Sequence, residues 1–319
     1  MVIHRLPADE RSVRVGIIDA AHPPVLTVGS GDEVIMETWS HWGGRVVPDM
    51  TLEDVLALRR TASMGPHSMT GPIEIASAEP GDLLQVDVLE LRPGQWGFNL
   101  ALPAPLGRGV LAERFPLGSL RHLRLDRETM TTELVPGVEL PLSPFLGIMG
   151  VAPAEDGPHS SVPPGPFGGN LDLRDIQVGT SLFLPVFRPG AGFYAGDAHA
   201  AQGDGEVNQT AIETSMEIAH LRLTALPRAD RLDLPELPWV ETPTHLVTIG
   251  LDEDLDEAVR QAVDSLVTHV SNRFGLEPID AYALASLAAD VEVTQAVNQV
   301  KGAHARLPWR RLPPLVGES

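Results

Sequence analysis

A stretch of thirteen residues, Ala195 to Val207, concentrates the side chains that could do chemistry. It holds three acids, one histidine, one glutamine and three glycines, and apolar residues lie on both sides of it. Glycines allow the tight turns that let polar groups crowd around a small ligand or ion. Such a density of ionisable groups favours a functional site over a polar hairpin loop without chemistry.

Within this stretch, Asp197 and His199 are two residues apart. On a β-strand, that spacing places both side chains on one face. A carboxylate and an imidazole together suit a divalent metal such as zinc, provided that a further ligand comes from elsewhere in the chain. The candidates for that ligand are His41 and Asp172. The Asp-x-His pair is a weak signal alone, because surface pairs without a metal are as common.

The acids that follow could supply proton transfer at such a site. Glu206 and Glu213 are candidates for the carboxylate base that activates a water molecule beside a metal. Asp204 lies in a Gly-Asp-Gly turn that could direct its side chain into the same site. Hydrolysis of a stable bond at neutral pH needs help of this kind, because a metal lowers the pKa of bound water from about 16 to about 7.

The composition excludes several classes of function. The formal net charge of −20 over 319 residues argues against nucleic acids and anionic membrane surfaces as partners. The absence of cysteine excludes disulfides, thiol nucleophiles and thiolate metal sites. P-loop, dinucleotide-binding and serine-hydrolase motifs are also absent. The segment Met1 to Glu10 lacks the apolar core of a signal peptide, so we expect a cytoplasmic protein.

The elements that position these residues are expected to be mostly strands. The 30 glycines and 29 prolines are typical of short strands joined by turns. Three glycine turns are each followed by a β-rich run, over residues 33–38, 83–89 and 181–186. In the second run apolar and polar residues alternate, which is the pattern of a half-buried strand.

One short helix and two long loops are predicted between these strands. Residues 49–60 read as a helix in which Thr51 and Asp54 resemble a capping box. Residues 93–120 and 141–170 are rich in glycine and proline, and we expect both to be long ordered loops. Loops of that length in a compact domain are usually functional when they are ordered.

The pattern changes after residue 250. Apolar residues recur at helical spacing from Leu255 to Val270, and a second helix over 280–289 and a strand over 291–297 follow. We therefore divide the chain in two parts. Residues 1–250 form a β-rich region that carries the active-site loops, and residues 251–319 form a C-terminal α+β segment packed on the same core.

Three groups of segments carry a pattern over most of the chain. They are Gly71 to Ile75 with Ala78 to Asp82, Pro163 to Asp172, and Gly196 to Val207 with Ala211 to Glu213. In order and spacing they resemble the acetamidase/formamidase family, whose most specific motif is the third. The likeness extends from about Thr27 to about Pro308.

The resemblance implies a fold and a reaction. The expected fold is mostly β with α+β additions, built on a β-sandwich core of jelly-roll type. The expected reaction is the hydrolysis of short aliphatic amides, formamide or acetamide, to ammonia and the carboxylic acid. A divalent metal, zinc or calcium, and a homo-oligomer are also implied.

The resemblance assigns the family's site residues to matching positions of this sequence. Asn170 and Asp172 match the family's Gly-Gly-Asn-x-Asp block, and Glu213 matches its Ala-Ile-Glu end. The Gly-Asp-x-His block is matched by Asp197, His199, Gln202, Asp204 and Glu206. The metal ligands are then expected among Asp197, His199, Asp172 and His41.

The remaining roles concern the substrate and the proton. We expect Glu206 to be the general base, with Glu213 behind it and Asp204 as a further candidate. The amide side chains of Asn170 and Gln202 could hydrogen-bond a substrate amide, which both donates and accepts. Phe167 would wall a small pocket that limits substrate length.

Two alternatives stay open. A non-catalytic jelly-roll protein could bind a small amide or a carbohydrate, with calcium holding its acid-rich turns. His199 discriminates, because calcium takes oxygen ligands while zinc accepts imidazole. The other alternative keeps the hydrolase and changes its substrate to a larger amide, which residues 93–120 and 141–170 would select.

Overall fold

Strands dominate the computed structural model, which describes residues 1–61, 64–227 and 236–313. Within these ranges the strands up to residue 150 are β1 Ile3–Leu6, β2 Val13–Val15, β3 Ile17–Ile18, β4 Leu26–Val28, β5 Asp32–Thr38, β6 Ser68–Ile75, β7 Leu83–Ala101, β8 Ser119–Arg124, β9 Thr131–Val135, β10 Val138–Pro141 and β11 Phe145–Gly150. Those that follow are β12 His159–Ser160, β13 Gly168–Asn170, β14 Ser181–Pro185, β15 Phe193–His199, β16 Glu213–Leu226, β17 Trp239–Glu241, β18 His245–Asp252, β19 Asp290–Gln295 and β20 Lys301–Pro308. The helices are α1 His41–Gly44, α2 Leu52–Arg59, α3 Leu255–Phe274 and α4 Pro278–Ala288, with 3-10 turns at Ala112–Arg114 and Trp309–Arg311.

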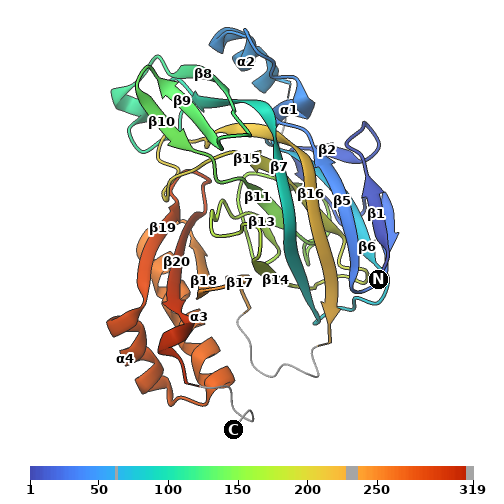
Figure 1. Cartoon of the computed structure of the whole chain (residues 1–319), viewed down its shortest axis with the longest axis vertical. Helices are drawn as coiled ribbons and strands as arrows, with labels where there is room; N and C mark the ends of the chain where they lie inside the picture. Colours follow the sequence, from blue (N-terminus) through green and yellow to red (C-terminus); the bar gives the residue numbers. More distant parts are fainter. Residues whose placement is uncertain (62–63, 228–235, 314–319) are drawn as a thin grey trace.

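Sixteen of the described strands join in one sheet, whose longest path is β13-β11-β15-β16-β7-β14-β17-β18-β20-β19. Strands β5, β6 and β8 branch from this path at β16, β15 and β7, and β1, β2 and β4 pair with β5 or β6. Figure 1 shows the long strands β7 and β16 side by side through the middle of the molecule. The expectation of a mostly β fold is confirmed, whereas its jelly-roll connectivity stays a prediction.

The predicted loop over residues 93–120 is wrong for its first part, because β7 continues through Ala101. The misleading signal is the pair Pro93-Gly94, which would end most strands. Here Pro93 lies opposite Met216 of β16, where the pairing register shifts on both sides of Met216. A bulge of this kind accommodates a residue that cannot donate to the ladder.

The predicted loop over residues 141–170 is also wrong in part, because it contains β11, β12 and β13. The glycines in this segment allow the backbones of neighbouring strands to approach each other closely. A Cβ atom on Gly150 would lie 2.6 Å from the amide nitrogen of Gly169 on β13. Glycine in a strand can mark such an approach as well as a turn, and these strands border the site described below.

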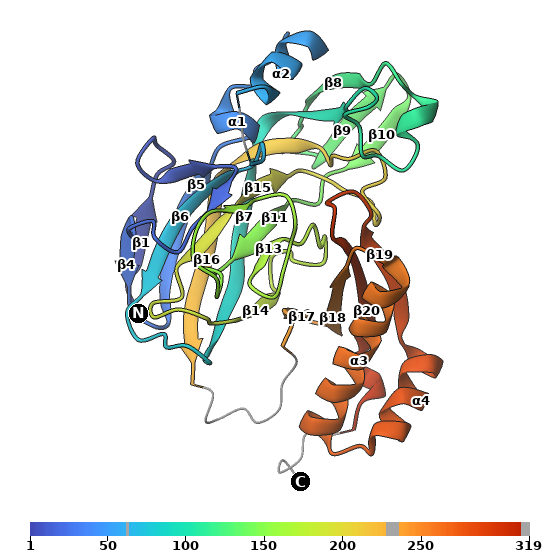
Figure 2. The same cartoon turned by 180° about the vertical axis from the view of Figure 1, so that it is seen from behind.

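The C-terminal helices and strand agree with their predicted positions. Asp254 caps α3 because its carboxylate accepts a hydrogen bond from the Asp256 amide, and Gly275 ends the helix with a φ of 70°. Packing against the sheet is close, because a Cβ on Gly250 would lie 1.9 Å from the Ala258 carbonyl oxygen. Strand β18 pairs with β20 along its whole length, so residues 245–250 join the C-terminal strands (Figure 2). The division at residue 250 stays a prediction.

The short helix α2 has the capping box that its sequence predicts. Thr51 accepts a hydrogen bond from the Asp54 amide, and the Asp54 carboxylate accepts one from the Thr51 amide. The helix lies at the same end of the molecule as β8, β9 and β10 (Figures 1 and 2). In the described ranges, no helix combines the length and the apolar character that crossing a membrane requires.

Candidate metal and catalytic site

Two carboxylates and one imidazole from two paired strands form the centre of a buried polar cluster. Strand β15 carries Asp197 and His199, and His199 lies opposite Glu213, the first residue of β16. Each of the three is at most 3% exposed. The Nε2 atom of His199 lies 3.5 Å from Asp197 Oδ2 and 3.2 Å from Glu213 Oε2. Asp197 and His199 thus reach one site from the same strand.

Two further histidines enter the cluster from other elements. His41 begins α1, and its Nε2 atom lies 2.8 Å from Asp197 Oδ1 and 3.3 Å from Glu213 Oε2. His67 immediately precedes β6, which pairs with β15, and its Nε2 atom lies 4.0 Å from Asp197 Oδ2. His67 is absent from the residues predicted from sequence. Its one signal was its place just before the Gly71 to Ile75 segment.

Asp172 and Glu206 lie with His199 in a second acidic group. The Oδ1 atom of Asp172 is 3.8 Å from His199 Nδ1, and Asn298 donates a hydrogen bond of 2.5 Å to the other carboxylate oxygen. Ligand atoms of Asp172, His199 and Glu206 all lie within 4.8 Å of one another. The imidazole of His199 therefore presents Nε2 to Glu213 and Nδ1 to Asp172.

The backbone at this site is strained. Asp172, Asp197 and Glu206 have φ values of 48°, 53° and 46°. The left-handed region is uncommon for residues other than glycine, although aspartate tolerates it better than most. Strained positions of this kind cluster at functional sites, where the surrounding structure holds them in place.

Charges in the cluster balance one another. Burial opposes ionisation of Asp197, but the neighbouring His67 and His199 hold the pKa of its carboxyl well below the ordinary value. Burial acts in the opposite direction on His199, yet Glu213 and Asp197 raise the pKa of its imidazole well above the ordinary value. Without a metal, the imidazole of His199 therefore keeps its proton. A bound cation would displace that proton, because a ligand imidazole must be neutral.

The other groups shift chiefly because they are buried. Burial lowers the pKa of His67 to about 4, which leaves its ring neutral and able to bind a metal. Burial raises the pKa of Asp172 to about 7. Burial and the adjacent Asp172 raise the pKa of Glu206 well above the ordinary value. One oxygen of Glu206, Oε2, is buried without a hydrogen-bond partner among the described residues.

The donor set fits a divalent metal ion. Two groups of ligand atoms meet the spacing of a site, His41 with His67 and Asp197, and Asp197 with His199 and Glu213. They share Asp197, so three imidazoles and two carboxylates surround one region. A mixture of nitrogen and oxygen donors suits zinc, whereas calcium takes oxygen ligands.

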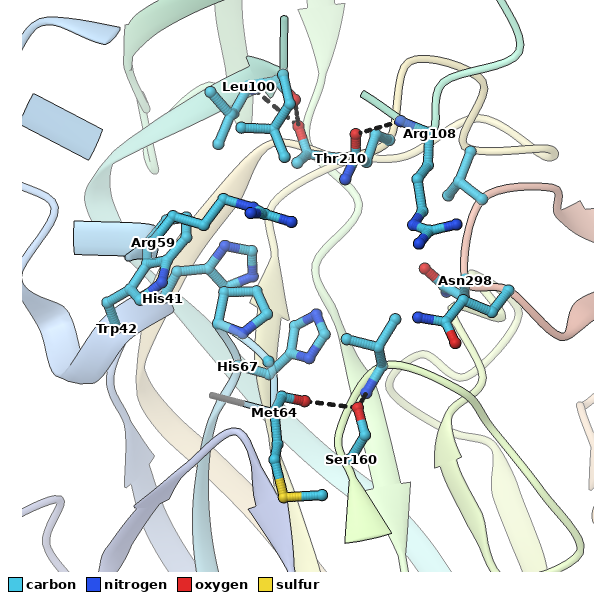
Figure 3. Close-up of a pocket in the computed structure, with 17 residues that line it drawn as sticks. His41, Trp42, Arg59, Met64, His67, Leu100, Arg108, Ser160, Thr210 and Asn298 are labelled. Carbon is cyan, nitrogen blue, oxygen red and sulfur yellow. Dashed lines mark hydrogen bonds between the residues drawn. The ribbon is translucent and has the colours of Figure 1, made fainter. Parts of the chain in front are cut away.

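A cavity of about 440 Å³ adjoins the cluster, and His41 and His67 lie in its wall. Figure 3 shows His41 next to Trp42 and below the side chain of Arg59, and His67 above Met64. The amide side chains of Gln209, Asn298 and Gln299 also line it. Because Asn298 also donates a hydrogen bond to Asp172, it connects the cavity wall to the second acidic group.

Three predicted substrate-binding residues are absent from the lining of this cavity. The amide of Gln202 donates to the Asp172 carbonyl at 2.8 Å, and the amide of Asn170 donates to the Val162 carbonyl at 3.0 Å. Phe167 is half-buried and packs against the hydrophobic core. The amide nitrogens of Asn170 and Gln202 thus bond backbone carbonyls, and a role of these residues toward a substrate stays a prediction.

Asp204 lies in a different group. Its carboxylate is 2.7 Å from Arg174, and with Asp175 and His304 it forms a separate group of possible ligands. The carboxylate of Asp175 is 3.3 Å from Arg306 on β20. Arg174 and Arg306 thus face the acids of this group. The group connects the segment between β15 and β16, which carries Asp204, to the C-terminal strand β20, which carries Arg306.

Gly147 of β11 makes room for the cluster, which leads to a testable prediction. A Cβ there would lie 2.4 Å from Asp172 Oδ1, 2.7 Å from His199 Cε1 and 3.0 Å from Asp197 Oδ2. Overpacking typically costs about 1–3 kcal/mol, so we expect Gly147→Ala to lower the melting temperature. Displaced ligands should also weaken metal binding at least about tenfold, as loss of supporting contacts does.

Gly203→Ala is the matched control, because nothing lies within 4 Å of a Cβ at that position. Thermal melts and metal titrations of the two variants, run in parallel, check the prediction. An unchanged metal affinity in Gly147→Ala would mean that the ion binds away from Asp172, His199 and Asp197.

Known proteins share both the sequence pattern and the fold. A sequence model of the acetamidase/formamidase family matches residues 19–162 and 158–307. An acetamidase from Mycolicibacterium smegmatis is 28% identical over 245 residues, which cover 58% of this chain and 59% of that protein. The chain spans between 57% and 59% of the length of the curated relatives it matches.

Two solved structures correspond to almost the whole chain. The acetamidase from Bacillus halodurans has a TM-score of 0.85 and 31% identity, and the match covers 96% of this chain and 97% of that one. The acetamidase from Yersinia enterocolitica has a TM-score of 0.87 and 28% identity, with 98% and 93% covered. The sheet and the C-terminal segment are therefore shared together.

Proposed function

The chain belongs to the acetamidase/formamidase family, and on that premise we propose that it hydrolyses short amides with the help of a divalent metal. The reaction adds water to the amide carbonyl, breaks the C–N bond and yields a carboxylate and ammonium. The observation that carries the proposal is the meeting of Asp197, His199, His41 and Glu213 within hydrogen-bonding distances beside a cavity.

The proposed metal ligands are His41, Asp197 and His199, with His67 and Glu213 completing the set. A zinc ion held there supplies a Lewis acid for the amide carbonyl and lowers the pKa of water. The lining position of His41 and His67 favours this side of the cluster over the Asp172 side. Asp172 then faces the other nitrogen of His199, where an acid orients a ligand imidazole.

Glu206 is the proposed proton carrier. Its Oε2 atom has no hydrogen-bond partner among the described residues, so it is free to accept a proton from water. Burial and Asp172 raise the pKa of Glu206, and a raised pKa makes the carboxyl a better proton acceptor than an ordinary glutamate. The proton goes from the attacking water to Glu206 and then to the leaving nitrogen.

The substrate amide needs partners that both donate and accept. The side chains of Gln209, Asn298 and Gln299 line the cavity and have both capacities. The amide nitrogens of Asn170 and Gln202 bond the Val162 and Asp172 carbonyls, and a role of these residues toward the substrate stays a prediction.

The direct test is ammonia release from formamide, acetamide and propionamide, with the metal content of the same preparation determined by elemental analysis. Ammonia from these amides and zinc near one equivalent are expected. Bound metal without ammonia from any amide would contradict the proposal, and calcium alone would favour the non-catalytic binder.

A homo-oligomer is the proposed assembly, in the cytoplasm. Support comes from α4, which exposes three large apolar side chains, Ile279, Tyr282 and Leu287, at 71%, 58% and 86%. Apolar groups gathered on one exposed element often mark an interface.

A further inference from the structure

The cavity beside the cluster differs in charge from the rest of the chain. The sequence has 43 acids against 23 lysines and arginines. Yet the 17 described residues that line the cavity include no aspartate or glutamate, and they include Arg59 and Arg108. The chain as a whole is therefore anionic, whereas the charged side chains that line the cavity at its proposed active site are cationic.

The two arginines reach the cavity from separate elements. Arg59 is the last residue of α2, and Arg108 lies in the segment between β7 and the Ala112–Arg114 turn. Figure 3 shows both guanidinium groups directed into the cavity from different sides. Neither guanidinium has an ion-pair or hydrogen-bond partner within residues 1–61, 64–227 and 236–313. Arg108 is held only through its backbone amide, which donates to Gln209 at 2.8 Å.

The cavity is also larger than the smallest amides require. Its volume of about 440 Å³ falls within the range of about 300–1,000 Å³ typical of sites for drug-sized ligands. Formamide and acetamide would fill a small part of it and would leave both guanidinium groups without a partner. An anionic group on a longer ligand can reach both, because Arg59 is half-buried and Arg108 is exposed.

We propose that the cavity binds an amide that carries a carboxylate at its far end, and that Arg59 and Arg108 bind this carboxylate. A monoamide of a short dicarboxylic acid has this chemistry. The inference rests on the proposed amide hydrolysis and names its substrate class. For succinamate, water adds to the amide carbon, the C–N bond breaks, and succinate and ammonium are the products.

Arginine suits this role because its planar guanidinium matches a carboxylate with two parallel hydrogen bonds. The two guanidinium groups would also offset the repulsion that an anionic substrate meets near a chain of net charge −20. The amide end would lie at His41 and His67, which line the same cavity as the two arginines.

The kinetic test compares three amides of equal chain length: butyramide, succinamide and succinamate. Only succinamate is charged, and succinamide controls for a polar end without charge. Because charge-assisted hydrogen bonds are strong, we expect kcat/KM for succinamate to exceed that for butyramide at least about tenfold, mainly through KM. In Arg59→Gln and Arg108→Gln the ratio of the two values should fall toward one. Arg60→Gln, an exposed neighbour outside the cavity lining, is the matched control and should keep the ratio.

Binding of products gives a readout that needs no turnover. Calorimetric titration of the metal-loaded protein with succinate and butyrate compares ligands that each offer one carboxylate to the cluster. Succinate that binds more tightly than butyrate, and loses this advantage in the double variant Arg59→Gln/Arg108→Gln, supports the proposal. This holds even if no amide is hydrolysed. Absence of hydrolysis would reject the amidase function and leave the carboxylate site standing. Equal binding of the two acids overturns the proposal, and ammonia from butyramide would then leave amide hydrolysis standing.

Discussion

Asp197→Asn is expected to abolish stoichiometric metal binding and to lower kcat/KM for short amides by at least about 10³-fold, since a metal supplies several kcal/mol of transition-state stabilisation. Asp197 lies between His41 and His199, and it belongs both to the ligand group of His41 and His67 and to that of His199 and Glu213. Asparagine keeps its shape and tolerates the left-handed backbone at this position. Elemental analysis and ammonia release measure the two effects.

Asp204→Asn separates this cluster from the neighbouring acidic group. Asp204 pairs with Arg174 and lies with Asp175 and His304, so the metal content of this variant should equal that of the unmodified protein. His41→Ala removes a ligand from a different element and should reproduce the loss of metal. Full metal content in both Asp197→Asn and His41→Ala would place the ion elsewhere.

Glu206→Gln is expected to reduce kcat by about 10²–10⁴-fold, the range typical of a lost general acid–base group, while the metal stays bound. Glutamine has the same shape and cannot accept a proton from water. Because burial raises the pKa of Glu206, glutamine also resembles the protonated carboxyl, so the variant should fold. Single-turnover assays and metal analysis of the same sample separate chemistry from metal loss.

Glu217→Gln controls for the removal of a carboxylate outside the cluster. Glu217 lies on β16, four residues after Glu213, and its carboxylate pairs with Arg127 and Arg92. Its kcat should match that of the unmodified protein. A comparable kcat in Glu206→Gln would assign proton transfer to another group, with Glu213 the next candidate.

Local patterns predicted the elements whose signals lie within a few residues. The capping box of α2 and the caps and apolar spacing of α3 are complete in the sequence, and the structure has both helices. The same holds for Asp197 and His199, because a spacing of two on one strand fixes their common direction.

Elements that depend on distant partners could not be predicted in this way. The bulge that carries β7 through Pro93 exists only because β16 shifts register opposite it. The buried strand β11 needs Gly147 and Gly150 for approach to Asp172 and to β13, and glycine alone indicates a turn equally well.

The same limit applies to the site. His67 joins the cluster because β6 pairs with β15, a contact between residues far apart in the chain. Asp204 turns away because Arg174 provides a partner, and a Gly-Asp-Gly turn does not reveal which way it faces. The arginines of the cavity are brought together by α2 and the segment after β7, which no short motif connects.

The central claim, that the buried cluster binds the metal that supports amide hydrolysis, is tested most directly by one titration. Metal is removed with a chelator, zinc is returned stepwise, and ammonia release from acetamide is measured against bound zinc. We expect no release from the metal-free protein and a linear rise that ends at one equivalent. Full activity before any zinc is added would contradict the claim.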